Sequence, residues 1–250
     1  MVEPKRMTAI KTEIASIING RFIKGNGLTS SFVITKLGQR ISRVRILASV
    51  IDKFVSNDKT YATLTLDDGS ATIRAKAFQD ISILENFEIG DKIEMIGRIR
   101  SYADEIYIVP EIVQKVENED ILKLRKLEIK KQEIELKKKY QIISELQKRV
   151  SDLEELKRLA KRKFKIKEEE VESILLSKEI FSEQTIEEEV KNKKEAIIKL
   201  IEKLDTGMGC EYSMLIKESG LKEDILERII NELLNEGVCF EPRPGIIKLL

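Results

Sequence analysis

The 250-residue chain contains no histidine and no tryptophan, and it has only two cysteines and four prolines. Histidine is the side chain most often used for acid–base catalysis near neutral pH. The sequence also shows no phosphate-binding loop, and no serine or cysteine beside a plausible base. We therefore expect a protein that is not an enzyme.

The two cysteines, Cys210 and Cys239, are too few for a disulfide framework and fit no zinc-ligand spacing. We expect both to be buried free thiols in a reducing compartment. Neighbouring strands are expected to carry them, because residues 209–211 can pair with residues 238–240. The sequence predicts no metal and no cofactor.

Long hydrophobic runs are absent too. None approaches the ~18 residues of a membrane span, and the start of the chain lacks the apolar core of a signal peptide. We expect a soluble, cytoplasmic protein without a membrane partner.

The charges nearly cancel over the whole chain but not along it. The 45 basic and 44 acidic residues give a net charge of +1, so no overall field favours a polyanion. Residues 40–116 carry 11 basic and 12 acidic groups, a net −1, whereas residues 120–163 carry 15 and 8, a net +7. The basic segment could contact DNA, although a solvated helix face is the commoner explanation for such a run.

The sequence predicts a multidomain chain with four segments. Residues 1–39 form a lead-in, with a strand and a turn of helix within residues 8–24, packed on the domain that follows. Residues 40–116 contain five short strands. Residues 117–192 have no proline or glycine, which predicts helix. Residues 193–250 combine three helices with a terminal hairpin, the order of a winged helix.

Side chains alternate between two faces along the predicted strands at residues 60–66 and 71–78. One face is apolar, with Ala62, Leu64, Leu66, Ile73, Ala75 and Ala77. Three strands, a short helix near residues 80–87 and two further strands make up the order of a five-stranded OB-fold barrel. The turn at residues 67–69 contains two aspartates, and we interpret Asp-Gly there as a hairpin turn rather than a metal site.

The opposite, outward face combines cations with aromatic rings. Cations beside flat rings suit the phosphates and bases of single-stranded nucleic acid. Tyr107 is equally consistent with a core position or a ligand contact. The candidate nucleic-acid-binding residues are Tyr61, Arg74, Lys76, Phe78, Arg98, Arg100 and Tyr102.

The helical segment carries an apolar side chain at every seventh position: Leu122, Ile129, Leu136, Ile143 and Val150. The second position of such a heptad is apolar only in the last half, and Arg125, Gln132 and Lys139 occupy it earlier. This broken heptad favours packing on other helices over a long two-stranded coiled coil. We expect the stripe to stay partly uncovered by the barrel and to serve subunit assembly.

The third helix of the predicted winged helix has a mainly acidic exposed face, with Glu223, Asp224, Glu227 and Arg228. Acidic groups repel phosphates, so a major-groove contact is disfavoured. We expect this face to dock partner proteins.

The first 116 residues contain, in order, the stretches MTAI (7–10), IINGRF (17–22), VITKLG (33–38), ISRVRILASV (41–50), LDDG (66–69) and GRIRSY (97–102). With these stretches, this part of the chain resembles the middle subunit of replication protein A, the single-stranded-DNA-binding complex of archaea and eukaryotes. The order of the stretches rather than any single motif carries the resemblance. Tyr102 matches a stacking aromatic and Arg74 a basic strand position of the family, while Lys76 replaces a stacking tryptophan, with Phe78 as the nearest ring.

The resemblance implies an archaeal, nucleoid-associated protein that binds single-stranded DNA and protects it in replication, repair and recombination. It also implies a heterotrimer with a large and a small replication protein A subunit, formed through the helix after the barrel. The C-terminal module would recruit replication or repair proteins.

Two other functions remain open from the residues. One is a protein-only adaptor, in which the barrel and the winged helix each dock a partner without touching nucleic acid. The other is a duplex-binding transcription factor, which the acidic third helix disfavours.

Overall fold

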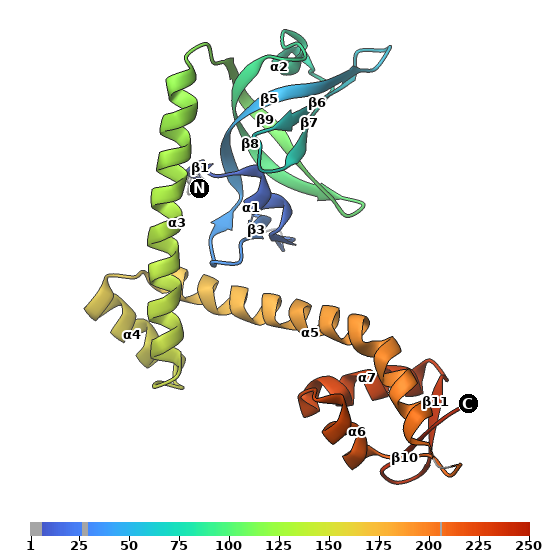
Figure 1. Cartoon of the computed structure of the whole chain (residues 1–250). Helices are drawn as coiled ribbons and strands as arrows, with labels where there is room; N and C mark the ends of the chain where they lie inside the picture. The colour runs from blue at the N-terminus through green and yellow to red at the C-terminus, as the bar shows by residue number, and fades with distance from the viewer. Residues whose placement is uncertain (1–6, 27–29, 206) are drawn as a thin grey trace. The chain divides into compact units, whose positions relative to one another are not determined.

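The computed structural model describes residues 7–26, 30–205 and 207–250, and for residues 184–188 only the backbone (Figure 1). The chain divides into two compact units, Met1–Lys178 and Glu179–Leu250. None of the helices described is both long enough and apolar enough to cross a membrane.

Five strands of the first unit form a sheet that closes on itself. They are β5 (Arg43–Val55), β6 (Tyr61–Asp67), β7 (Thr72–Phe78), β8 (Lys92–Tyr102) and β9 (Glu105–Lys115). The pairing order is β5-β6-β7-β9-β8, and β8 also pairs with β5. If these five strands are numbered 1 to 5 along the chain, their order around the closed sheet is 1-2-3-5-4, with strand 4 pairing with strand 1. This is the strand order of the OB fold. The predicted five-stranded order is confirmed.

The interior of this closed sheet is apolar because strand side chains alternate between two faces. The six predicted core residues of the β6–β7 hairpin are all less than 5% exposed, which confirms the predicted faces. Gly97 lies at a register shift between β8 and β9. A Cβ atom there would meet Ile108 Cγ2 at 2.4 Å and the Val109 carbonyl oxygen at 2.6 Å, so only glycine fits.

Residues of the lead-in share the hydrophobic core of the closed sheet. β1 (Ile10–Lys11) pairs in parallel with β5, and α1 (Ile14–Ile18) buries Ile14 and Ile17 completely. The predicted strand and helical turn are confirmed. The sequence did not indicate the small antiparallel sheet of β2 (Arg21–Ile23), β3 (Phe32–Ile34) and β4 (Arg40–Ile41). The short helix before β8 is α2 (Ser82–Glu85).

The helical segment forms three helices: α3 (Glu119–Gln147), α4 (Leu153–Phe164) and α5 (Glu168–Leu204). The breaks need neither proline nor glycine. Asp152 caps α4 by accepting a hydrogen bond from the Glu155 backbone N–H at 2.7 Å, and Lys165 ends it with a left-handed φ of 57°. The predicted first helix of the terminal segment is the C-terminal part of α5.

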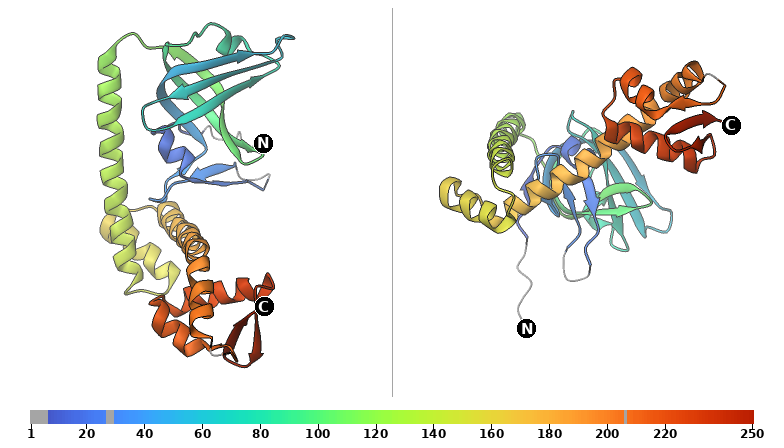
Figure 2. Two further views of the ribbon diagram at one scale, coloured as in Figure 1. Left: turned by 45° about the vertical axis from the view of Figure 1, so that its right-hand side comes forward. Right: turned by 90° about the horizontal axis from the view of Figure 1, so that it is seen from below.

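α3 lies along the closed sheet, as both views in Figure 2 show. Glu94 of β8 is 6% exposed and accepts two hydrogen bonds from Arg45, both 2.8 Å, one from Gln114, and one from the buried Arg125 of α3. A further ion pair joins Lys11 and Glu128 at 2.6 Å. Ionic contacts therefore fix the N-terminal half of α3 to the closed sheet.

The second unit has a core of its own. It combines the end of α5, α6 (Tyr212–Ser219) and α7 (Glu223–Asn235) with a three-stranded antiparallel sheet. These are the elements of the predicted winged helix, and that assignment itself stays a prediction.

The strand order in the second unit corrects one expectation. The order is β10 (Cys210–Glu211), β12 (Ile246–Leu249), β11 (Cys239–Arg243). The predicted pairing of residues 209–211 with residues 238–240 is wrong, because the β11–β12 hairpin places β12 between them. Cys210 lies opposite Ile247, and Cys239 lies opposite Leu249. Both thiols are buried and free, as expected, and burial raises the pKa of each.

We expect Glu94→Gln to lower the free energy of unfolding by about 3 kcal/mol, because it leaves the buried Arg125 guanidinium without its main charged partner. Urea denaturation followed by circular dichroism measures the change. Glu119→Gln is the matched control, since Glu119 pairs with Lys92 at an exposed site. A loss no larger than that of the control would contradict the role of Glu94.

Acid should act on the same contact. The hydrogen bonds from Arg45, opposed by burial and supported by Arg125, lower the pKa of Glu94 from 4.5 to about 2. Because the pKa of Glu94 is lower in the folded state than in the unfolded state, the ionised carboxylate stabilises the fold. This stabilisation is complete at pH values above the unfolded-state pKa of about 4.5, and it is lost as the pH falls from about 4.5 to about 2. Over that interval the native protein should lose more stability than Glu94→Gln, and equal losses would argue against the shift.

Candidate nucleic-acid interface

Four aromatic rings form a continuous row on the outside of the closed sheet. Phe54, Tyr61, Phe78 and Tyr107 come from four different strands, β5, β6, β7 and β9. Successive ring centroids lie 6.2, 5.4 and 6.4 Å apart. Phe54 and Phe78 are each 53% exposed. We call these four residues the ring row; their spacing is that of interacting aromatic pairs.

Two of these rings were not among the predicted site residues. Strict alternation along β5 from the buried Val44, Ile46, Ala48 and Val50 would bury Phe54 as well. A register shift between Val50 and Asp52 moves Phe54 to the outside, opposite Thr63. Nothing in the sequence marks that bulge. The sequence is consistent with either a core position or a ligand contact for Tyr107. In the structure Tyr107 is half-buried and borders Phe78.

Beside the ring row, two predicted phosphate contacts share one acidic partner. Lys76 Nζ lies 2.6 Å from Glu105 Oε2, and Arg74 Nη1 lies 3.4 Å from Glu105 Oε1. Lys76 Nζ also lies 4.7 Å from the centroid of the Tyr107 ring. The side chain of Lys76 is only 13% exposed, whereas that of Arg74 is 57% exposed.

A second acidic residue binds Arg98. Glu111 accepts hydrogen bonds from Arg43 and Arg98, both at 2.6 Å. Burial tends to raise the pKa of Glu111, but the two guanidinium groups outweigh it, and the pKa lies below its ordinary value. Arg100 is half-buried and donates to the Ile99 carbonyl oxygen at 3.1 Å.

Tyr102 lies at the tip of the β8–β9 hairpin and is 78% exposed. It pairs in register with Glu105 across a two-residue turn, in which Ala103 and Asp104 have left-handed φ angles of 47° and 63°. The hairpin tip thus presents one open ring, Tyr102, beside the acidic side chain that holds Lys76.

The predicted turn at residues 67–69 is confirmed, and its aspartates have structural partners. Asp67 Oδ1 accepts from the Gly69 N–H at 2.7 Å, and Asp68 Oδ2 accepts from the Ile14 N–H at 2.8 Å at the start of α1. Over the described ranges, no cluster of three or more histidine, cysteine or acidic residues is arranged to hold a metal ion.

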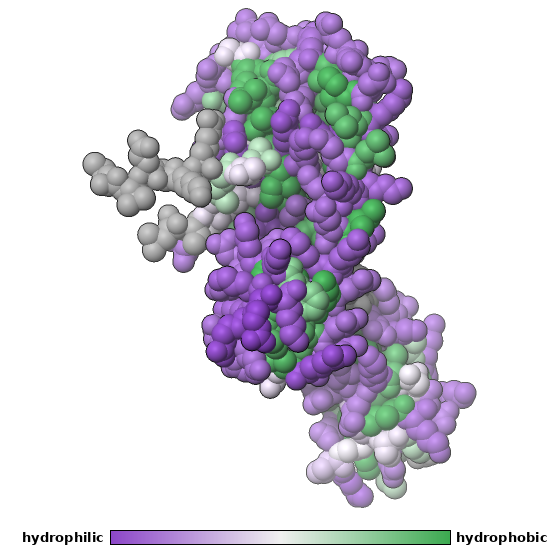
Figure 3. All heavy atoms as spheres, turned by 90° about the vertical axis from the view of Figure 1, so that its left-hand side faces the viewer, coloured by the Kyte–Doolittle hydropathy of each residue, from purple (hydrophilic) through white to green (hydrophobic). Residues whose placement is uncertain are grey.

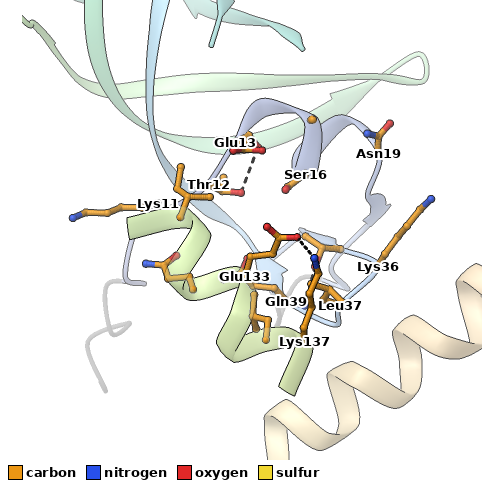
Figure 4. Close-up of a pocket in the computed structure, with 15 residues that line it drawn as sticks. Lys11, Thr12, Glu13, Ser16, Asn19, Lys36, Leu37, Gln39, Glu133 and Lys137 are labelled. Carbon is orange, nitrogen blue, oxygen red and sulfur yellow. Dashed lines mark hydrogen bonds and ion pairs between the residues drawn. The ribbon is translucent and has the colours of Figure 1, made fainter. Parts of the chain in front are cut away.

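The predicted assembly stripe faces the chain itself over much of its length. Ile129 and Leu136 line a cavity of about 320 Å³ between α3 and the lead-in (Figure 4). Ile143 is fully buried in a small core with α4 and α5, and Val150 packs against that core; Leu122 is half-buried. Their role in assembly stays a prediction.

Other apolar side chains of α3 are exposed instead. On the face of the first unit that carries α3, groups of hydrophobic residues lie among hydrophilic ones (Figure 3). Lys126, Lys130 and Lys131, which form no ion pair with any residue that the structure describes, lie on the same helix. The exposed apolar side chains are Ile121, Leu124, Leu127 and Ile134.

In the second unit, Glu223, Asp224, Glu227 and Arg228 are all exposed on α7, as the sequence predicted. The opposite face of α7 buries Ile225, Leu226, Ile229, Ile230 and Leu233. The docking of a partner protein on this acidic face stays a prediction.

A closed five-stranded sheet in the OB strand order, followed by a long helix and a second compact unit, defines an OB-fold protein. The chain belongs to the family of the protein MJ1654 of Methanocaldococcus jannaschii. The two are 30% identical over 213 residues, which cover 85% of this chain and 77% of that relative. No protein-family model matches the chain.

Solved structures similar to the chain include a replication protein A heterotrimer bound to single-stranded DNA, at 15% identity, a TM-score of 0.44, and coverage of 52% of this chain and 98% of that chain. The Stn1–Ten1 complex of S. pombe follows at 14% identity, a TM-score of 0.45, and coverage of 53% and 96%. The second OB-fold domain of replication protein A from Methanococcus maripaludis has 22% identity, a TM-score of 0.25, and coverage of 31% and 86%. These TM-scores are low, and the fold assignment rests on the strand order.

Proposed function

We propose that the chain binds single-stranded DNA through the ring row, as the middle subunit of an archaeal complex of the replication protein A type. The observation that carries this proposal is the row of four touching rings on the outside of an OB-ordered sheet. Bases stack on such rings only when they are not paired in a duplex. The exposed Tyr102 extends the platform.

Stacking rather than charge should dominate the affinity. The sheet segment has a net charge of −1, and Arg74, Lys76 and Arg98 already form ion pairs, the first two with Glu105 and the third with Glu111. Each stacked base contributes about 1–3 kcal/mol, whereas affinity from phosphate contacts falls steeply with salt. The complex should therefore depend only weakly on salt.

Assembly with a large and a small subunit belongs to the same proposal. Ile121, Leu124, Leu127 and Ile134 form an apolar stripe at helical spacing on α3, and each is at least 40% exposed. At 3.6 residues per turn, Lys131 lies within this stripe, and Lys126 and Lys130 lie beside it. A partner helix with an apolar stripe and acidic side chains along it is complementary to this surface.

The winged-helix assignment, and recruitment of replication or repair proteins by the second unit, complete the proposal. The exposed face of α7 offers three acidic groups against one arginine among the four candidate residues. Such a face repels phosphates and attracts basic segments of proteins.

A protein-only adaptor is the second candidate function. The pairing of Arg74, Lys76 and Arg98 with acidic partners favours it, because no free cation of these three remains near the ring row. Against it, the exposed rings of Phe54, Phe78 and Tyr102 offer flat faces on which unpaired bases can stack.

The direct test is a fluorescence titration of the full chain with an oligothymidylate of about 30 nucleotides, longer than the site of one OB fold. We expect weak binding that exceeds binding to duplex DNA of the same length. Phe78→Ala and Tyr102→Ala should each cost about 1–3 kcal/mol of binding free energy. Lys76→Ala should cost less binding free energy, because the Lys76 ammonium group already forms an ion pair with Glu105.

Phe164→Ala is the matched control, since Phe164 is an exposed ring on α4, outside the ring row. It should leave the affinity unchanged. Tighter binding to duplex than to single strand, or equal effects of Phe164→Ala and Phe78→Ala, would overturn the proposed function.

For assembly, Leu124→Glu and Leu127→Glu should abolish retention of partner subunits when the tagged chain is purified from its native host and analysed by mass spectrometry. Both side chains are more than half exposed, so the fold should tolerate the change. Gln141→Glu is the control, with the same charge change at an exposed position of α3. Unchanged retention in both variants would exclude this stripe as the assembly surface.

For the second unit, we expect the amide resonances of α7 in the full chain to stay in place when single-stranded or duplex DNA is added. Resonances of the closed sheet should move with the single strand in the same sample, which serves as an internal control. Shifts of the α7 resonances with duplex DNA at moderate salt would identify the unit as a DNA reader instead.

A further inference from the structure

Glu105 is the residue on which the cations beside the ring row converge. Its two carboxylate oxygens are divided between them: Oε2 binds Lys76 at 2.6 Å and Oε1 approaches Arg74 at 3.4 Å. A carboxylate with two cations imitates the arrangement that a phosphate group makes with the same side chains. Glu105 is 38% exposed, so an incoming strand can reach the contact.

The same contact covers an aromatic ring. With its ammonium group held by Glu105, Lys76 lies over Tyr107, with Nζ 4.7 Å from the ring centroid. Tyr107 is the last member of the ring row and touches Phe78. While Lys76 stays there, that face of Tyr107 is closed to a base.

Glu105 lies where the contact can open. Main-chain pairing between β7 and β9 is limited to Arg74 with Tyr107 and Ala75 with Ile108, so Glu105 precedes the paired stretch. It directly follows the turn at Ala103 and Asp104. The ion pairs of Glu105 are additional contacts between β7 and β9 beyond this short paired stretch. Exposed ion pairs contribute little to stability, so they can break without unfolding the sheet.

We propose that Glu105 is an internal competitor for the phosphates of single-stranded nucleic acid and limits the affinity of the ring row. This inference rests on the proposed function. A phosphate of the incoming strand takes the place of the Glu105 carboxylate on Lys76 and Arg74, and Lys76 moves off Tyr107, which then accepts a base. The exchange of one anion for another leaves the number of paired cations unchanged, so binding releases few ions.

The test is Glu105→Gln, which keeps the length of the side chain and removes its charge. We expect about three- to tenfold tighter binding of oligothymidylate, in keeping with one unit charge removed a few ångströms from the phosphates. Freeing up to two cations should steepen the slope of log affinity against log salt by about 0.7–1.4. Glu119→Gln, with the same charge change at the start of α3, should alter neither quantity.

A double-variant comparison separates competition from a general charge effect. In a Lys76→Gln, Arg74→Gln background, Glu105→Gln should lose most of its effect, because no cations remain for it to release. Thermal melts of every variant verify the fold. An equal gain in both backgrounds would show long-range repulsion and overturn the competitor role.

The outcomes also distinguish this inference from the proposed function. If the native chain binds oligothymidylate but Glu105→Gln binds no more tightly, or with an unchanged salt slope, only the competitor role is wrong. If neither protein binds single-stranded DNA, the proposed function and this inference fall together.

Discussion

The carboxylate of Glu94 sits almost out of contact with water between two guanidinium groups, one from its own sheet and one from α3. A buried charge is tolerated only when its partners are close and well oriented, so this contact admits few alternative geometries. Arg125 is buried with it and also bonds Glu128 and the Arg45 carbonyl oxygen. The position of α3 against the closed sheet follows from this cluster. The position of α3 in turn decides which of its side chains face the sheet and which remain exposed.

The outer surface of the closed sheet is thereby divided into a part that α3 covers and a part that stays open. Around Glu94 and Arg45 it is covered by α3 through ionic contacts. Across β6, β7 and the start of β9 it carries the ring row and stays open. One sheet can in this way hold a helix on one part of its outer surface and leave aromatic rings open on another, because neighbouring strands present different side chains outward.

Local patterns predicted much of this architecture. Along the two strands within residues 60–78, every second side chain is apolar. Because one face of the hairpin must be buried, only one register places all of these side chains inside, and the core of the β6–β7 hairpin follows from it. The acidic face of α7 follows in the same way from a period of 3.6. Phe54 could not be predicted, because a one-residue bulge reverses the alternation that the first half of β5 establishes.

Non-local contacts explain the other differences. Arg125 interrupts the heptad of α3 because Glu94, 31 residues earlier in the chain, is its partner. The sequence predicts that the stripe from Leu122 to Val150 stays partly uncovered by the barrel, yet α4 and α5 bury Ile143. Cys210 and Cys239 lie on either side of β12, and only the whole sheet of the second unit reveals that order.

The most direct measurement of DNA binding by the ring row is ultraviolet crosslinking of the full chain to an oligothymidylate carrying photoreactive thymidine analogues, with the crosslinked residues mapped by mass spectrometry. We expect crosslinks at Phe54, Tyr61, Phe78 and Tyr107, and at Tyr102 on the hairpin tip. Crosslinks confined to the lysines of α3 or to the second unit, with none on the ring row, would contradict the proposed role of these rings.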